Sequence, residues 1–178
     1  MVLYKKLFKD SQMKEIKIED FSENPFKLIG SDWMLITAKK DEKVNMMTAS
    51  WGGLGILWNK NVATIYVRPQ RYTKEFIDNG DTFSLCILPE QFRQVMNYCG
   101  SHSGKTEDKV AATNLTVKEI DNVPVFEESR VVIICKKLYA QEMTEESFID
   151  KSLVEKNYQA KDFHTMYIAE IEKVLIAN

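Results

Sequence analysis

Runs of apolar residues, continuous in some segments and alternating with polar residues in others, are typical of β-strands along most of this chain. Residues 33–38 (WMLITA) and 44–51 (VNMMTASW) flank the polar segment 39–43 (KKDEK), and together they predict a hairpin. Residues 62–68 alternate with a period of two, which predicts a half-buried strand that stops at Pro69. The apolar side chains of the hairpin are expected in the core, namely Leu35, Ile36, Met46 and Met47.

Short helices interrupt these strands. Further strands are predicted for residues 82–88, 115–120, 130–140 and 164–176, and helices for residues 73–79, 90–98, 109–114 and 144–156. Gly80 is expected to end the first helix, and Pro89 to occupy the first position of the second. About six strands with short helices in their connections, and no regular βαβ alternation, predict a mainly β fold, an antiparallel Greek-key-like barrel.

The composition is that of an ordinary folded protein. The chain has 178 residues, of which 44% are hydrophobic and 28% charged, and we expect one domain over residues 1–178. The net charge of −2 argues against nucleic-acid binding. No apolar run approaches the ~20 residues of a membrane span, and residues 1–20 carry charges where a signal peptide needs an apolar segment. We therefore expect a cytoplasmic protein with no membrane partner.

The cysteines and histidines offer little disulfide or metal chemistry. Cys86, Cys99 and Cys135 are odd in number and widely spaced, which favours reduced thiols. Cys99 and His102 have the spacing of half a zinc site, but no second pair of ligands follows, so no metal is expected. Cys86 is expected in a buried strand, and Cys99 in a loop.

Two glycine-containing segments have incomplete nucleotide-binding motifs. Residues 100–106 (GSHSGKT) have three residues between the glycines where a P-loop has four, and they follow a predicted helix instead of a strand. Residues 53–58 (GLGILW) have Trp58 where the dinucleotide-binding fingerprint has its third glycine. We therefore reject nucleoside-triphosphate hydrolysis and a Rossmann site.

Small hydroxyl side chains lie at the end of the predicted hairpin. Thr48 and Ser50 precede Trp51, and such a run can align backbone N–H and hydroxyl groups along the edge of a flat heterocycle. An ordinary strand end that leads into a turn at residues 52–53 is the more common interpretation of the same pattern.

Residues 68–73 (RPQRYT) have the composition of a phosphate site, at the junction of a predicted strand and helix. Arginine forks match phosphate oxygens, and a helix N-terminus adds free N–H donors. Thr73 is the expected N-cap, and because Phe76 follows it where a capping box has Glu or Gln, some donors stay open. A capped helix with solvated arginines is equally compatible with these residues.

Four motifs occur along the chain in a fixed order, and they are Asn45-x-Met-Thr-x-Ser-Trp51, Arg68-Pro-x-Arg-Tyr-Thr73, Ser103-Gly-Lys-x-x-Asp-Lys109 and His164-x4-Ala-Glu-Ile171. In this order they resemble the flavin reductase-like family, the FMN-binding split barrels that include flavoredoxin. The resemblance covers roughly residues 24–174. The chain departs from the family pattern at Lys105, where Arg is more common, and at Ala169, where Gly is usual.

The resemblance implies a homodimer in which each FMN lies at the subunit interface. It assigns to the isoalloxazine edge Thr48, Ala49, Ser50 and Trp51, to the ribityl chain and phosphate Arg68, Arg71, Tyr72 and Thr73, and to the phosphate end Ser103, Gly104 and Lys109. It also places His164 near the flavin or nicotinamide as a catalytic residue, although a lone histidine at the start of a strand is more often structural. The apolar, glycine-bearing residues 51–58 are the expected shared wall.

The function implied is that of an FMN-binding split β-barrel that acts as an oxidoreductase. We expect it to take a hydride from NADH or NADPH and to pass electrons to free flavin, a ferric chelate or a protein, with the flavin supplying the chemistry. Two alternatives remain open: an FMN electron carrier without nicotinamide turnover, and a non-catalytic flavin-binding or sensing module of the same fold.

Overall fold

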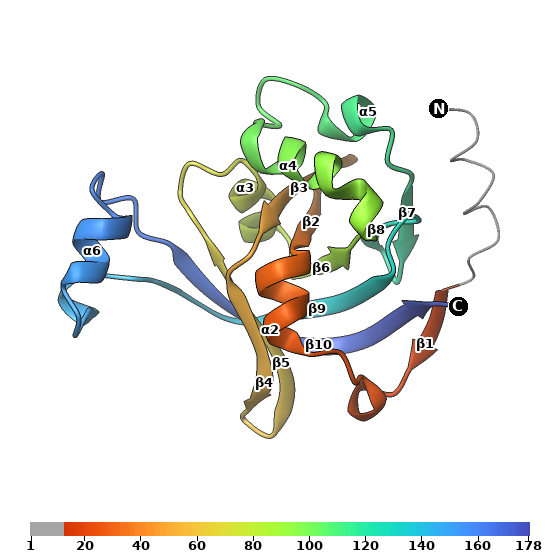
Figure 1. Cartoon of the computed structure of the whole chain (residues 1–178), viewed down its shortest axis with the longest axis horizontal. Helices are drawn as coiled ribbons and strands as arrows, with labels where there is room; N and C mark the ends of the chain where they lie inside the picture. The colour runs from red at the N-terminus through yellow and green to blue at the C-terminus, as the bar shows by residue number, and fades with distance from the viewer. Residues whose placement is uncertain (1–12) are drawn as a thin grey trace.

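Antiparallel strands make up most of the chain, and the computed structural model describes them over residues 13–178 (Figure 1). The strands in this range are β1 (Met13–Ile16), β2 (Met34–Lys40), β3 (Lys43–Ala49), β4 (Gly52–Leu57), β5 (Lys60–Val67), β6 (Thr82–Ile87), β7 (Val117–Ile120), β8 (Val123–Phe126), β9 (Val131–Glu142) and β10 (Thr165–Ala177). The helical segments are η1 (Ile18–Asp20), α2 (Pro25–Lys27), η2 (Leu28–Asp32), α3 (Thr73–Asn79), η3 (Glu90–Phe92), α4 (Arg93–Ser101), α5 (Lys109–Thr113), η4 (Glu145–Ser147) and α6 (Ser152–Asn157). The predicted mainly β fold with short helices is confirmed.

The large sheet turns back on itself. It has eight strands in the order β3-β2-β6-β9-β10-β5-β4, with β1 beside β10, and β7 and β8 form a separate hairpin. Ser50 and Trp51 alone connect β3 to β4, which stand at the two ends of that order. Because three Cα–Cα steps reach at most about 11 Å, the two edges of the sheet must come together here. The sheet is therefore a split antiparallel barrel, as predicted.

Both faces of the central strands are buried, which explains their continuous apolar runs. In β9, Val131, Ile133 and Cys135 belong to one core cluster, whereas Val132 and Ile134 belong to a second cluster that also holds residues of α4 and β8. A strand covered on both sides has no polar face, so its sequence does not alternate. The core residues predicted from the hairpin are all buried, namely Leu35, Ile36, Met46 and Met47.

The predicted turn at residues 52–53 is wrong, because these glycines begin β4. A Cβ on Gly52 would lie 2.8 Å from the backbone oxygen of Thr64 and 3.0 Å from Cε of Met34, so the close approach of β5 requires glycine. The turn lies instead at Trp58 and Asn59, whose φ angles of 52° and 57° suit a two-residue hairpin turn of type I′.

The helix predicted at residues 73–79 is confirmed, whereas the prediction of one continuous helix over residues 144–156 is wrong, because a non-helical stretch separates η4 from α6. In its place, residues 143–164 form an arm that carries η4 and α6 and projects from the sheet between β9 and β10 (Figure 1). The apolar residues of the arm form a small cluster of their own, made of Met143, Phe148, Val154, Tyr158 and Phe163. Pro89 is the N-cap of η3 and not the first residue of a helix.

The three cysteine thiols are free and buried. Cys86 lies in β6, as predicted, but Cys99 lies within α4 and not in a loop. Among residues 13–178, no helix is long and apolar enough to cross a membrane. Residues 1–12, on which part of the argument against a signal peptide rests, lie outside the described residues.

Candidate functional site

A small pocket lies where the start of α3 meets the loop that follows α4. It has a volume of about 100 Å³ and is lined by Arg71, Tyr72, Thr73, Gly100, Ser101, His102, Ser103, Gly104 and Lys109. The structure thus brings together two segments, residues 71–73 and residues 103–109, that the sequence assigns to one phosphate site. We call it the Arg71/Lys109 pocket.

Two cations, the buried Lys109 and the partly buried Arg71, line this pocket without a carboxylate partner among residues 13–178. Lys109 is 4% exposed, and its Nζ donates to the carbonyl oxygens of Met46 at 2.5 Å and Cys99 at 3.2 Å. Nη1 of Arg71 donates to the carbonyl oxygen of Gly100 at 2.7 Å. Within residues 13–178, neither side chain forms an ion pair. Because buried charges are costly when unpaired, the pocket is suited to an anion.

Burial shifts the titration of both cations. It lowers the pKa of Lys109 to about 8, and the positive charge of Arg71 acts in the same direction. Burial also lowers the pKa of Arg71. An anion placed between these groups would favour their charged forms and raise the pKa of Lys109 again.

Asn45 fixes one wall of the Arg71/Lys109 pocket. Its Nδ2 donates to Oγ1 of Thr73 at 2.9 Å. Gly104 packs on the same side chain, because a Cβ there would lie 2.3 Å from Oδ1 of Asn45 and 3.1 Å from the Tyr72 ring. The prediction that Thr73 is the N-cap is wrong, since Tyr72 holds that position and the Thr73 hydroxyl accepts from Asn45 instead.

The residues at the end of β3 point in different directions. The Thr48 hydroxyl donates to the carbonyl oxygen of Met96 at 2.5 Å, which ties β3 to α4. Ala49 packs against the barrel core. Ser50 and Trp51 line a second, mostly apolar pocket of about 640 Å³, whose walls come from α2, β4 and the arm. Trp51 is 47% exposed, so much of its ring is available as a wall.

Arg68 does not line the Arg71/Lys109 pocket, and its side chain belongs to a separate cluster at the base of the arm. Its guanidinium donates to Asp162 at 2.5 Å and to the carbonyl oxygen of Asn157 at 2.9 Å. It also lies 5.3 Å from the centre of the Tyr158 ring. These contacts hold the arm against the end of β5, and they satisfy the positive charge of Arg68.

His164, the predicted catalytic residue, belongs to the same cluster. Its Nδ1 is 2.8 Å from the Tyr158 hydroxyl, and its ring centre is 5.2 Å from that of Trp51. Burial, together with the positive charge of Arg68, lowers the pKa of His164 to about 4. The imidazole is therefore neutral near pH 7, with one ring nitrogen that donates and one that accepts.

The four motifs and the fold agree with a known family. A family model described as the flavin reductase like domain matches residues 26–178. The chain belongs to this family. Comparison with curated proteins gives no match.

Solved structures of other flavin reductase-like proteins have the same fold. The FMN-binding domain of a flavin reductases-like enzyme from Shewanella baltica has a TM-score of 0.70 and 16% identity, with 94% of this chain and 78% of that chain covered. Flavoredoxin from Methanosarcina acetivorans has a TM-score of 0.65 and 19% identity, with 90% and 74% covered. An NADH:FAD oxidoreductase from Streptomyces globisporus has a TM-score of 0.60 and 13% identity, with 82% and 81% covered. At these identities the likeness concerns the fold.

Sequence reasoning misses several pocket residues of this flavin reductase-like chain. Gly100, Ser101 and His102 line the Arg71/Lys109 pocket, although their segment is rejected as a P-loop. The signal that could have found them is their position directly before Ser103, at the end of α4 and its C-cap. Asn45 stands in the first motif, but nothing in the sequence indicates that its amide is buried against Thr73.

Proposed function

We propose that this chain binds FMN, with the phosphate in the Arg71/Lys109 pocket, and acts as a flavin-dependent oxidoreductase. The proposal rests on the buried Lys109 and the partly buried Arg71, which form no ion pair with a carboxylate among residues 13–178. A phosphate dianion matches both charges, and a guanidinium fork and an ammonium both suit its oxygens. The pocket volume of about 100 Å³ is roughly three times that of a water molecule in the liquid. It suits a phosphate group and leaves the flavin ring outside.

The end of β3 is the place we assign to the ring. A Cβ on Gly100 would lie 3.4 Å from Cβ of Thr48, so the pocket and the strand end are adjacent. Beyond Thr48, the chain offers backbone donors and the hydroxyl of Ser50, and the apolar wall with Trp51 excludes water. When bound, FMN supplies the hydride and electron chemistry, and the protein supplies position and electrostatics.

We assign to His164 a positioning role as a neutral hydrogen-bond donor. Burial raises the pKa of Tyr158, so its hydroxyl stays protonated and can donate to Nδ1 of His164. Nε2 then carries the remaining imidazole proton and can donate to a bound molecule. With a pKa of about 4, this histidine stays neutral near pH 7 and does not take up a second proton.

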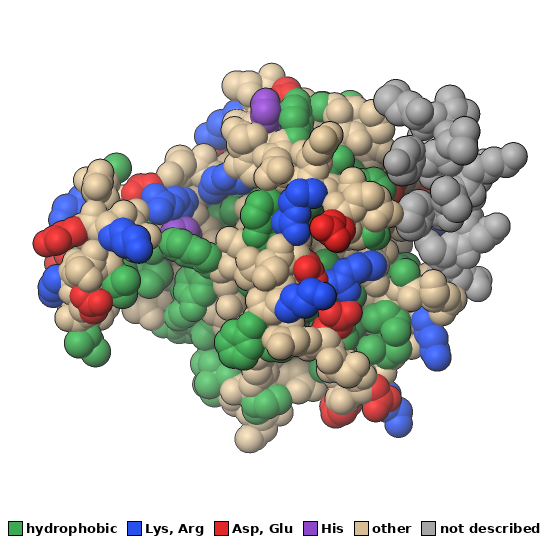
Figure 2. All heavy atoms as spheres, viewed as in Figure 1, with side chains coloured by type: hydrophobic (Ala, Val, Ile, Leu, Met, Phe, Trp, Pro, Cys, Tyr) green, Lys and Arg blue, Asp and Glu red, His purple; other side chains and the backbone are tan. Residues whose placement is uncertain are grey.

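A two-fold symmetric homodimer is the assembly we propose, because a broad apolar face is exposed. Phe26, Ile56 and Trp58 are 86%, 70% and 54% exposed. Figure 2 shows hydrophobic side chains gathered on the face formed by α2, β4 and the arm. β4 is also an edge strand, whose free backbone groups favour pairing. Light scattering of the FMN-loaded protein should give twice the chain mass of 20.6 kDa, and a monomer would contradict the dimer.

The cofactor can be identified without any assay of turnover. The purified protein should have the visible absorption spectrum of a flavin, and heat or acid should release FMN that chromatography distinguishes from riboflavin and FAD. A colourless protein that does not take up added FMN would refute the proposal and would favour the alternative of a module that holds another ligand.

NADH or NADPH is the hydride donor we propose, and anaerobic stopped-flow bleaching of the flavin band tests it. Either nucleotide should bleach the wild-type protein within minutes, and His164→Ala should slow bleaching by about a hundredfold with little change in FMN affinity. Bleaching by dithionite but by neither nucleotide would favour the electron carrier. Equal rates in the variant would leave His164 with a structural role only.

A further inference from the structure

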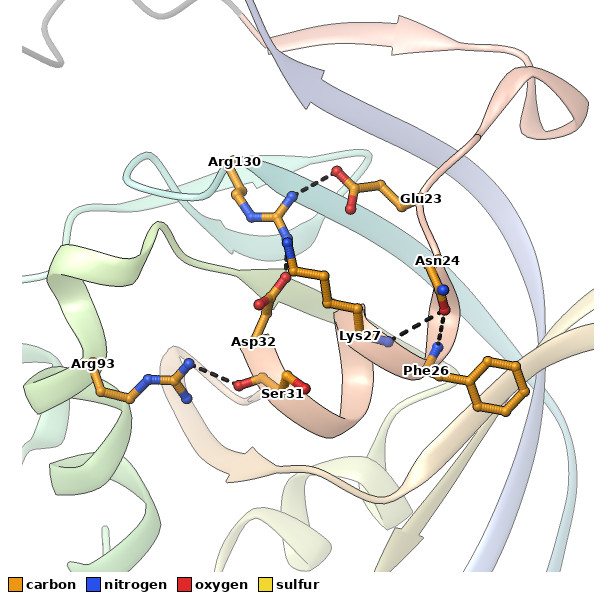
Figure 3. A network of polar contacts seen from close by, with 8 residues as sticks. All are labelled: Glu23, Asn24, Phe26, Lys27, Ser31, Asp32, Arg93 and Arg130. Carbon is orange, nitrogen blue, oxygen red and sulfur yellow. Dashed lines mark hydrogen bonds and ion pairs between the residues drawn. The ribbon is translucent and has the colours of Figure 1, made fainter.

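A second polar cleft lies at the other end of α4. It has a volume of about 500 Å³ and lies between η2, the segment after β6, the first turn of α4 and the start of β9. Figure 3 shows most of its charged side chains, with Arg93 reaching from α4 toward η2 and Arg130 between two carboxylates. None of the four motifs contributes a residue to this cleft.

The ion pairs in the cleft are unevenly distributed among its cations. Arg130 is fully paired, with Glu23 at 2.8 Å and Asp32 at 2.6 Å. Within residues 13–178, Arg93 and Lys27 form no ion pair. Because Glu90 also lines the cleft, its cationic and acidic side chains balance in number, but two of the carboxylates are taken up by Arg130 and Arg93 is left without an ion pair among the described residues.

Arg93 is held in place but not satisfied. Its Nη2 donates to the carbonyl oxygen of Ser31 at 2.8 Å, and its guanidinium lies 4.2 Å from the centre of the Trp33 ring. Its Nη1 is buried and has no hydrogen-bond acceptor within the described residues 13–178. A buried donor on a charged group is costly to leave unpaired, so an acceptor is missing at this place.

The chain also maintains an unfavourable backbone conformation beneath Arg93. Trp33 has φ 67° and ψ 166°, a region that is used almost only by glycine. This conformation places the Trp33 ring under the guanidinium, where the stacking fixes the plane of the fork. A fixed fork is the arrangement that suits the planar array of oxygens on an anionic ligand.

The cleft is connected to the candidate flavin site through α4. Met96 lines the cleft, and its carbonyl oxygen accepts the hydrogen bond from Thr48. Arg93 and Gly100 are seven residues apart on α4, which corresponds to about 10 Å along the helix. A molecule in the cleft would therefore lie beside the end of β3.

We propose that this cleft is a second binding site, which takes a molecule with an anionic oxygen group, carboxylate or phosphate, and in which Arg93 is the anchor and Lys27 a supporting charge. It is separate from the Arg71/Lys109 pocket, and it does not depend on the function proposed for that pocket. The ligand oxygen completes the hydrogen bonding of Nη1 after a small rotation of the guanidinium on the Trp33 ring.

Calorimetric titration of the purified protein with citrate and, separately, with inorganic pyrophosphate tests this site at constant ionic strength. Arg93→Gln should weaken binding of the preferred anion at least about tenfold, a typical loss for a charged hydrogen bond. Arg93→Lys, which keeps the charge but loses the fork, should weaken it less, and the exposed Lys27→Gln only a few-fold. Trp33 fluorescence should respond to the ligand in the wild type and not in Arg93→Gln. The anion that binds more tightly identifies a carboxylate or a phosphate ligand.

Arg71→Ala separates the two sites, and Lys118→Gln is the matched surface control. Both should retain the affinity of the second site, and FMN should bind Arg93→Gln as it binds the wild type. If Arg71→Ala abolishes anion binding while Arg93→Gln and Arg93→Lys retain it, the anion occupies only the Arg71/Lys109 pocket and the proposal is wrong. Absence of saturable binding to the wild-type protein would overturn it as well. Failure of FMN to bind would refute the proposed function, but it would not change the conclusion about anion binding at Arg93.

Discussion

Arg68 and Arg71 are three residues apart, yet they lie in opposite electrostatic surroundings. Arg68 is matched by the carboxylate of Asp162 at 2.5 Å, so its charge is balanced within the protein. Arg71 donates to the backbone carbonyl oxygens of Gly100 and Cys99, and the buried cation Lys109 also donates to that of Cys99. The first cluster closes the base of the arm, and the second is left with positive charge that a ligand can balance.

The comparison shows that the source of the negative charge decides what an arginine does. A guanidinium paired within the chain serves the fold, because a ligand would have to displace its carboxylate. A guanidinium held by carbonyl oxygens keeps its charge available. We therefore expect Arg71 to act in binding and Arg68 to act in anchoring the arm, although both stand in the same motif.

The largest effect is expected from Arg71→Ala. Removal of a charged hydrogen-bond donor to the phosphate should weaken FMN binding by about 1.5–3 kcal/mol. Riboflavin, which lacks the phosphate, should bind almost as before. Titration followed by quenching of flavin fluorescence measures both affinities.

Arg68→Ala is the matched control for that experiment. It removes the same side chain from the same motif, but it should leave the ratio of FMN to riboflavin affinity unchanged. A drop in this ratio equal to that of Arg71→Ala would show that Arg68 also reaches the phosphate, and the contrast between the two arginines would be lost.

A slightly smaller effect is expected from Gly104→Ala. The added Cβ would lie 2.3 Å from Oδ1 of Asn45, so the loop or the amide must move. Overpacking of this kind costs about 1–3 kcal/mol of stability, and the displaced wall should also weaken FMN binding. Thermal unfolding should show the loss for Gly104→Ala and not for Gly30→Ala, where a Cβ would meet nothing within 4 Å.

The affinity for FMN, but not that for riboflavin, should depend on pH. The pKa of Lys109 is about 8 without the anion, and the phosphate raises it, so above about pH 8 FMN binding takes up a proton. FMN affinity should therefore fall as the pH rises from 8 to 10, by at most about tenfold per unit. Riboflavin affinity should stay flat, and a parallel fall for both ligands would remove Lys109 from the phosphate site.

The smallest effect is expected from Asp162→Asn, which unpairs Arg68. Partly exposed ion pairs contribute about 0.2–1 kcal/mol, and the loss should be local to the arm. Hydrogen exchange should become faster in residues 143–164, while the melting temperature and the FMN affinity change little. If exchange in the arm stays the same, the ion pair does not anchor it.

The sequence predicts the parts of this molecule that depend on local pattern. The period of residues 62–68 and the helix at 73–79 are confirmed, because alternation and a terminal glycine act over a few residues. The arm is predicted wrongly, because its apolar residues pack on one another in a local cluster and not along one helix face. β4 is missed, because the need for glycine at position 52 comes from the close approach of Thr64 on the neighbouring strand, which the sequence does not show.

The candidate site is predicted only as far as residue types allow. The motifs assign Arg71 and Lys109 to one phosphate site. The sequence does not show that they form no ion pair with a carboxylate among residues 13–178, because ion pairing depends on the tertiary structure. The same holds for Arg68, whose partner Asp162 lies far away in the sequence and near it in the fold. No local sequence pattern distinguishes an arginine that pairs with a carboxylate of the chain from one that is available to bind a ligand.

The affinities of the wild-type protein for FMN and for riboflavin test the central claim most directly. If the Arg71/Lys109 pocket holds the phosphate, FMN should bind at least about tenfold more tightly than riboflavin at neutral pH, since two cations interact with the dianion. Equal affinities for the two flavins would contradict the account, because the phosphate would then gain nothing from Arg71 and Lys109.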